Sequence, residues 1–278
     1  MIGRVTGLPL LTAALLFLAL FTQPFLGLAH DWWTDPDAGH GLLLFPIALW
    51  LGWRAGRVTT PAPRLAWGAA ILVGAVLLRY IGGLAAEVFT MRVAMLAAFC
   101  GLVTYFLGTA QLRRWWLPLA LVALSIPLPA VVLSSLALPL QFKASQLGAA
   151  LLASRHVPVQ LTGNVIHLPG RTLFVTEACS GLRSLTALIS LGLLTGGLWL
   201  STGWGRVVLI AAAVPVAMLL NGIRIFLTGF FVFYVNPSLA DGFMHYSEGW
   251  AIFVVAFAIL GGLAWLVHAV ERRVRRPA

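Results

Sequence analysis

The feature of the sequence that most constrains the fold is a series of long apolar runs separated by short stretches that hold most of the charge. The runs cover about residues 8–28, 41–53, 65–80, 88–107, 117–136, 182–200, 207–235 and 249–270. Most approach the ~20 apolar residues that an α-helix needs to cross a bilayer. Only 9% of the residues are charged, against about 25% in an average soluble domain. We therefore predict an all-α polytopic membrane protein with about eight transmembrane helices in a single domain, residues 1–278.

A longer non-spanning region separates the fifth run from the sixth, and we predict that residues 137–181 form a small extracytoplasmic segment. Its first part, Leu140 to Arg155, mixes polar side chains with Leu and Ala, as in an amphipathic helix that lies at the membrane surface. Its second part, residues 157–175, alternates β-branched and polar residues around Gly and Pro turns, which is typical of a β-hairpin. The segment ends in a compact polar run with Cys179 in its middle.

The distribution of charge predicts which way the chain crosses the membrane. An even number of spans places both termini on one side, and the arginine-rich tail makes that side the cytoplasm by the positive-inside rule. The opposite side then holds every acidic residue except Glu271, namely Asp31, Asp35, Asp37, Glu87, Glu177, Asp241 and Glu248. We predict a multi-pass protein of the cytoplasmic (inner) membrane, in contact with its lipids. The net charge of +10 comes from basic residues at the ends of spans, so it does not indicate nucleic-acid binding.

This topology brings chemically reactive residues to one depth at the outer face. Cys179 precedes the sixth span, where a helix N-terminus can lower the pKa of a thiol and favour the thiolate. Arg224 lies about eighteen residues into the seventh span, roughly 27 Å from the inner surface at about 1.5 Å per residue. His245 comes just before the eighth span, and His40 opens the second. We interpret Cys179, Arg224 and His245 as one candidate site and His40 as a fourth candidate.

Each of these residues also has a purely structural interpretation. An intramembrane arginine is costly and by default functional, yet Arg224 can instead pair with Glu177 or Glu248 and hold helices together. Arg183, one turn beyond Cys179, either depresses the pKa of the thiol or extends its charged end to the interface. No spacing resembles a structural zinc site, so we predict no metal, and we predict no other cofactor.

Cysteine, histidine and arginine side chains together suit acyl transfer. The Cys179 thiolate would attack a peptide carbonyl, and the His245 imidazole would protonate the leaving amine. Arg224 would stabilise the oxyanion or orient the substrate carbonyl, helped by backbone N–H groups at the start of the sixth span. The residues therefore favour a thiol peptidase whose site lies at the membrane surface.

The same residues lie in motifs that resemble the exosortase/archaeosortase family. The motifs are Glu177-Ala178-Cys179-Ser180-Gly181-Leu182-Arg183-Ser184, then Asn221-Gly222-Ile223-Arg224-Ile225, then His245 ahead of the last span. Residues 35–41 resemble the family's N-terminal Ser-His-Gly segment, with alanine and glycine where a Tyr-Ser pair is frequent, and residues 163–166 fit its pre-cysteine region. The resemblance covers nearly the whole chain. It implies that Cys179 is the nucleophile, Arg224 the essential arginine and His245 the general acid/base, with Arg183, Glu177, Asn221 and His40 in supporting or substrate-binding positions.

The resemblance also implies a class of substrate. Such enzymes recognise exported proteins with a C-terminal sorting signal, which combines a short Pro-Glu-Pro-type (PEP-CTERM) motif, a transmembrane helix and a basic tail. They are thought to cleave near the motif and to pass the protein to an acceptor on the outer side. The chain ends soon after the last apolar run, so we expect any accessory function to belong to a separate protein. The motif variant, the acceptor (water, lipid or a polysaccharide-linked amine) and a bacterial or archaeal host stay open.

Two other classes of function remain. A membrane transporter or lipid flippase of envelope or exopolysaccharide biosynthesis would use Arg224 to bind an anionic headgroup. It would also need polar residues along a path to the cytoplasmic side, and the last three runs have almost none there. A structural subunit with a decayed site is disfavoured by the intact set of Cys179, Arg224 and His245.

Overall fold

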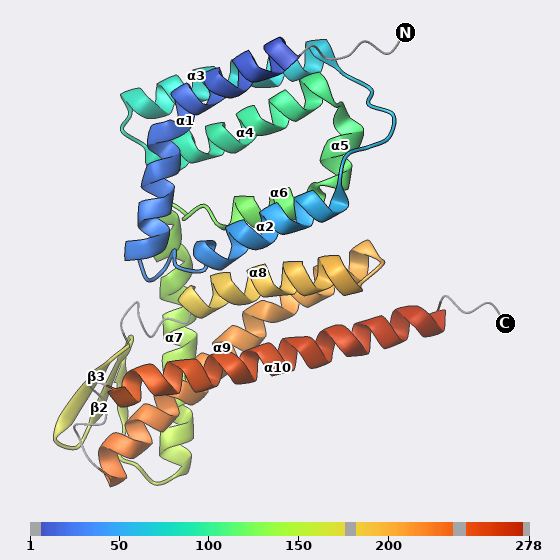
Figure 1. Cartoon of the computed structure of the whole chain (residues 1–278). Coiled ribbons are helices and arrows are strands. Elements are labelled where there is room, and N and C mark those ends of the chain that lie inside the picture. Colours follow the sequence, from blue (N-terminus) through green and yellow to red (C-terminus); the bar gives the residue numbers. More distant parts are fainter. Residues whose placement is uncertain (1–6, 176–181, 236–242, 275–278) are drawn as a thin grey trace. The chain divides into compact units, whose positions relative to one another are not determined.

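Helices dominate the structure, a computed structural model that describes residues 7–175, 182–235 and 243–274, without the side chains of residues 182–184, 243–250 and 253 (Figure 1). Contacts between residues divide the chain into two compact units, Met1–Leu128 and Pro129–Ala278. The single domain over residues 1–278 stays a prediction.

The first unit is built from helices that pack in pairs. In chain order they are α1 (Gly7–Thr34), α2 (Gly41–Ala55), α3 (Leu65–Leu84), α4 (Val88–Phe106), α5 (Thr109–Arg114) and α6 (Trp116–Leu124). Helix α3 packs against α4, α1 against α4, and α2 against α6. Buried side chains such as Phe21, Leu28 and Met95 form the core between α1 and α4.

Glycines let α3 and α4 approach each other closely. A Cβ added at Gly68 would lie 2.5 Å from the Cα of Tyr105, and one added at Gly101 would lie 3.0 Å from the Cγ of Leu72. Small residues are favoured where transmembrane helices meet, because close backbone contact gains van der Waals energy that apolar side chains cannot gain over lipid. The sequence of these two helices therefore favours a tight antiparallel pair.

The second unit combines a small sheet with long helices. Its elements are α7 (Ala130–Ser154), β1 (Gln160–Thr162), β2 (Val165–Leu168), β3 (Arg171–Phe174), α8 (Leu182–Trp199), α9 (Gly203–Tyr234) and α10 (Phe243–Val274). Helices α8, α9 and α10 pack against one another, and α7 packs against α9 (Figure 1). Pro215 lies inside α9, which continues as one helix through Asn221 and Gly222.

The predicted hairpin is confirmed and has a third strand. The strands are antiparallel in the order β1-β2-β3, with Leu161 opposite Ile166 and Ile166 opposite Leu173. Both connections contain a glycine with positive φ, Gly163 at 63° and Gly170 at 77°. Tight hairpin turns need such a backbone conformation, which glycine adopts without steric cost.

Within the described residues, five helical segments are long and apolar enough to cross a membrane: Gly7–Thr34, Leu65–Leu84, Val88–Phe106, Gly203–Tyr234 and Val254–Val274. They coincide with five of the predicted runs. Two further runs form shorter apolar helices, Gly41–Ala55 and Leu185–Trp199. The chain is thus a mostly helical protein with several candidate transmembrane helices, and the predicted number of about eight is not confirmed.

The apolar run over residues 117–136 is broken, as its two prolines, Pro127 and Pro129, predict. Helix α6 ends at Leu124, residues 125–129 are not helical, and α7 begins at Ala130 after Pro129. Proline lacks a backbone N–H and disfavours helix in the residue before it, so Pro127 and Pro129 explain the break.

The amphipathic helix expected over residues 140–155 is the second half of the longer helix α7. Its polar side chains do not share one exposed face: Lys143 and Gln146 are exposed, whereas Gln141 and Ser145 are buried against the rest of the second unit. The predicted boundary at residue 137 therefore lies inside a helix.

Candidate active site

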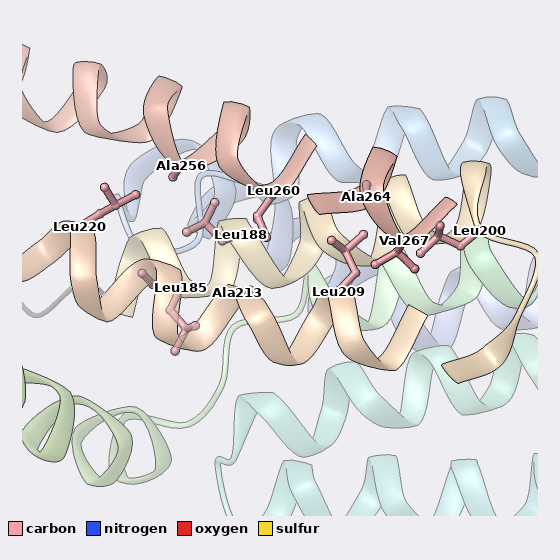
Figure 2. Close-up of a cluster of buried hydrophobic side chains, with 11 residues drawn as sticks. Leu185, Leu188, Leu200, Leu209, Ala213, Leu220, Ala256, Leu260, Ala264 and Val267 are labelled. Atoms are coloured by element: carbon pink, nitrogen blue, oxygen red, sulfur yellow. The ribbon is translucent and has the colours of Figure 1, made fainter. Parts of the chain in front are cut away.

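The three helices that carry the predicted site residues share one hydrophobic core. Leu185 and Leu188 of α8 pack there with residues of α9 from Leu209 to Leu220 and residues of α10 from Ala256 to Val267 (Figure 2). Leu185, Leu220 and Ala256 lie toward the same end of this cluster (Figure 2). Helix α9 therefore runs antiparallel to α8 and α10.

The backbone positions of Arg183, Arg224 and His245 lie at or beyond that end of the cluster. Arg183 belongs to the first turn of α8, two residues before Leu185. Arg224 lies one turn beyond Leu220 in α9. His245 lies in α10 about eleven residues before Ala256, which corresponds to about 16 Å of helix. The fold thus brings these three backbone positions to one end of the α8–α9–α10 bundle.

The side chains of Arg183 and His245 are outside the described part of the chain, and so are all atoms of Cys179 and Glu177. The contacts predicted among these four residues, and with Arg224, stay predictions. Cys179 itself lies three residues before α8 begins at Leu182 and four residues after Val175, the last described residue after β3.

Arg224 and Asn221 lie one turn apart on α9. Asn221 is buried, with 4% of its surface exposed, whereas Arg224 is half-buried. Arg224 lies about 32 Å along the helix from Gly203, at about 1.5 Å per residue. The carbonyl of Arg224 also accepts a 3.0 Å hydrogen bond from the Thr228 hydroxyl. A long apolar helix thus holds a cationic side chain far from its N-terminal end, in a partly buried setting.

Helix α7 crosses α9 directly beside Arg224. A Cβ added at Gly148 of α7 would lie 2.5 Å from Ile225 Cγ2, and one added at Gly222 of α9 would lie 2.4 Å from Leu147 Cδ2. The contact continues one turn later, where a Cβ at Gly229 would lie 2.8 Å from Leu152 Cδ1. The backbone at Arg224 is consequently fixed by close contacts on both sides of residue 224.

Two buried polar residues of α7 were not identified as site residues from the sequence. Gln141 is 3% exposed and Ser145 is fully buried. They lie on the helix face that also bears Gly148 and Leu152, because residues four and seven positions apart share a face. No hydrogen-bond partner for the Ser145 hydroxyl is found within the described ranges. The signal in the sequence is the Gln-x3-Ser-x2-Gly spacing, which places polar side chains and a contact glycine on one face.

Asn164 links the sheet to α7 and to Val175, the last described residue before Cys179. Its side-chain Nδ2 donates to the carbonyl of Val175 at 3.0 Å and to Gln141 Oε1 at 3.4 Å. The backbone N–H of Val175 donates to the Asn164 carbonyl at 3.0 Å. Val175 is also buried, packed in a cluster with Ile166, Leu152 and other residues of α7, α9 and the sheet.

His40 lies in the first unit, immediately before α2. Its Nε2 is 3.1 Å from the carbonyl of Leu124, and the indole Nε1 of Trp32 donates to the neighbouring carbonyl of Ser125 at 2.7 Å. These contacts tie the turn between α1 and α2 to the end of α6. These contacts give His40 a structural role, and its supporting role in a catalytic site stays a prediction.

Groups of three or more His, Cys, Asp or Glu side chains able to hold a metal ion are not found in the part of the chain that the structure describes. The arrangement in α9 instead offers one arginine beside a buried asparagine. A guanidinium can stabilise negative charge that develops on a carbonyl oxygen.

Residues 32–262, most of the chain, match a family model described as "Transmembrane exosortase (Exosortase_EpsH)". The chain belongs to the transmembrane exosortase family. The matched range contains Cys179, Arg224 and His245, and it covers most of the first and of the second unit. Exosortases are known as cysteine-type transpeptidases. Family membership together with the apolar helices identifies a multi-pass membrane protein. No curated protein and no solved structure shows significant similarity to the chain.

Proposed function

We propose that this exosortase is a thiol peptidase/transpeptidase that cleaves C-terminal sorting signals of exported proteins at the outer face of the cytoplasmic membrane. The observation that carries the proposal is the convergence of α8, α9 and α10. Arg183, Arg224 and His245 belong to one end of a single packed bundle, and Cys179 precedes the first residue of α8 by three positions in the sequence. Membership of a family of cysteine-type transpeptidases supports the same chemistry.

The reaction would proceed in two acyl-transfer steps. The Cys179 thiolate attacks the scissile peptide carbonyl, a C–S bond forms, and the C–N bond breaks as His245 gives a proton to the leaving amine. The released fragment carries the transmembrane helix and basic tail of the signal. An acceptor then attacks the thioester, returns the thiol and leaves the exported protein bound to the acceptor, or free if the acceptor is water.

Arg224 would stabilise the oxyanion that forms in each step. Its position, fixed by the α7–α9 crossing at Gly148 and Ile225, supports this role, because preorganised charge stabilises a transition state most strongly when it does not have to move. Asn221, one turn away and buried, would hold the local geometry. Glu177, Arg183 and His40 are proposed in supporting or substrate-binding positions.

The orientation proposed from charge places both termini in the cytoplasm and the site on the outer side. A substrate whose cleavage motif precedes its own transmembrane helix would present that motif at the outer membrane surface, where we propose the site. The proposed partners are such exported proteins, the surrounding lipids and a separate accessory protein.

A thiol-blocking experiment tests the proposal. The chain has two cysteines, so the variant Cys100→Ala leaves Cys179 as its only thiol. We expect this variant to cleave a reconstituted substrate with a Pro-Glu-Pro-type signal, and we expect N-ethylmaleimide to abolish cleavage as Cys179 is alkylated. Full cleavage by the completely alkylated protein would contradict the thiol mechanism.

A further inference from the structure

Asn164 lies in the turn between β1 and β2, and its side chain joins this turn to α7 and to Val175, directly after β3, by hydrogen bonds. Because a carbonyl only accepts hydrogen bonds, the contact with Val175 requires the amide nitrogen of Asn164 on that side. The same nitrogen then points its second hydrogen toward Gln141 Oε1. The orientation of the amide therefore follows from the chemistry of its partners.

The Asn164 contacts hold Val175 from several directions at once. Its N–H and its carbonyl both bond to Asn164, and its side chain is 3% exposed within the core of the second unit. The turn that carries Asn164 also rests on α7, where a Cβ at Gly163 would lie 3.7 Å from Phe142 Cε1. Gln141 is buried as well, so water does not compete for its hydrogen bond with Asn164.

Val175, which Asn164 holds in place, is only a few residues along the chain from Cys179, the proposed nucleophile. Cys179 follows Val175 by four residues, and four residues span at most about 14 Å when fully extended. The start of α8 limits the cysteine from the other side, three residues later at Leu182. The place where Val175 is held therefore restricts where the thiol can be.

We propose that Asn164 and Gln141 are positioning residues of the exosortase reaction, which fix the end of β3 on α7 and thereby align Cys179 with Arg224 of α9. The link to Arg224 runs through α7: Gln141 and Ser145 share the helix face whose Gly148 contacts Ile225, the neighbour of Arg224. Helix α7 thus contacts both the end of β3, which leads to Cys179, and α9, which carries Arg224. This inference rests on the function proposed above.

The test uses Asn164→Asp, which keeps the size of the side chain but replaces the donor with an acceptor that faces Val175 O and Gln141 Oε1. Gln141→Met removes the α7 partner with little change in volume. Gln160→Ala, an exposed position on β1, is the matched control. All variants are made in the Cys100→Ala background as the full-length, membrane-reconstituted protein.

Two readouts separate positioning from a general loss of structure. We expect Asn164→Asp to lower kcat for a Pro-Glu-Pro-type substrate by about tenfold or more with little change in KM, because small misplacements of a reacting group carry large rate penalties. We also expect the rate at which a maleimide alkylates Cys179, followed against pH, to change at least threefold. The Gln141→Met variant should shift both readouts in the same direction, and Gln160→Ala should shift neither.

The alkylation profile makes the two proposals distinguishable. If Asn164→Asp and Gln141→Met both retain the wild-type kcat and the wild-type alkylation profile, the positioning role is overturned even though Cys179 remains the nucleophile. If Cys179→Ala still cleaves the substrate, the proposed function fails, and with it the part of this inference that concerns catalysis. If the melting temperature of Asn164→Asp is far below that of the wild type, the test rests on Gln141→Met, for which the same two quantities are measured.

Discussion

Gly148 of α7 lies so close to Ile225 of α9 that a Cβ on the glycine would approach Ile225 Cγ2 to 2.5 Å. Ile225 is β-branched and has little rotamer freedom in a helix, so it cannot easily move aside. Arg224 is its immediate neighbour in the sequence. The position of the proposed catalytic arginine thus depends on the absence of one methyl group from the helix opposite.

The first prediction concerns this close contact. Gly148→Ala should lower the free energy of unfolding by about 1–3 kcal/mol through overpacking, measured by thermal unfolding in detergent. Gly261→Ala in α10 is the control, because a Cβ there meets no atom within 4 Å, and its melting temperature should not fall. The double variant Gly148→Ala/Ile225→Ala should be less damaged than the sum of the two single variants. Additive losses would contradict the contact.

The second prediction concerns Glu271, which is 2% exposed and closes the turn between α8 and α9. Its carboxylate accepts hydrogen bonds from the backbone N–H groups of Ser201 and Thr202, at 3.0 and 3.2 Å, and from both hydroxyls. Glu271→Gln keeps the shape but sets an amide donor against these donors, so we expect a loss of about 1–3 kcal/mol in unfolding free energy. The neighbouring exposed Arg272→Gln serves as the control, and equal melting temperatures for the two variants would contradict the assignment.

The third prediction concerns an ion pair in the first unit. Arg92 Nη2 lies 2.7 Å from Asp31 Oδ2, and the arginine side chain is 5% exposed while that of the aspartate is 36% exposed. Removing the aspartate leaves a buried cation, whereas removing the arginine leaves a carboxylate with access to solvent. Asp31→Leu should therefore destabilise the protein more than Arg92→Met does, by thermal unfolding. The double variant should be more stable than Asp31→Leu alone, and the reverse order of the single variants would contradict this interpretation.

The fourth prediction separates the charge of Arg224 from its shape. Arg224→Gln should lower kcat by about 10²–10³, the usual effect of removing one group that stabilises an oxyanion. Arg224→Lys should retain intermediate activity, because it keeps the charge but loses the planar fork of donors. The measurement is kcat for cleavage of a signal-bearing substrate by each purified variant. A glutamine variant with wild-type kcat would show that Arg224 has only a structural role.

Hydropathy predicted the long helices well because continuous apolar runs leave few alternatives in a membrane. The segments found for α1, α3, α4, α9 and α10 begin and end close to the predicted runs. At residues 117–136 apolarity alone does not show the break between α6 and α7, but Pro127 and Pro129, which lack backbone donors, predict it. Whether a helix is continuous depends on its backbone hydrogen bonds, and the two prolines indicate where these are interrupted.

The polar side chains of α7 show a second limit of the sequence. A helix with Gln141, Lys143, Ser145 and Gln146 among apolar residues is equally consistent with a polar face in water and with polar groups buried against another helix. The structure buries Gln141 and Ser145 and exposes the other two. Only the tertiary partners, α9 and the turn that bears Asn164, decide between these possibilities. The motifs around Cys179, Arg224 and His245, by contrast, were evident in the sequence and lie in the range that matches the family.

The most direct test of the central claim is co-expression with a tagged substrate that carries a Pro-Glu-Pro motif, a transmembrane helix and a basic tail, read as the size of the substrate on a gel. We expect the wild type and Cys100→Ala to shorten the substrate, and Cys179→Ala to leave it whole. Cys179→Ala is the informative variant because alanine removes the sulfur with little change in volume. Shortening by Cys179→Ala at the wild-type rate would contradict the thiol mechanism and favour a transporter or flippase.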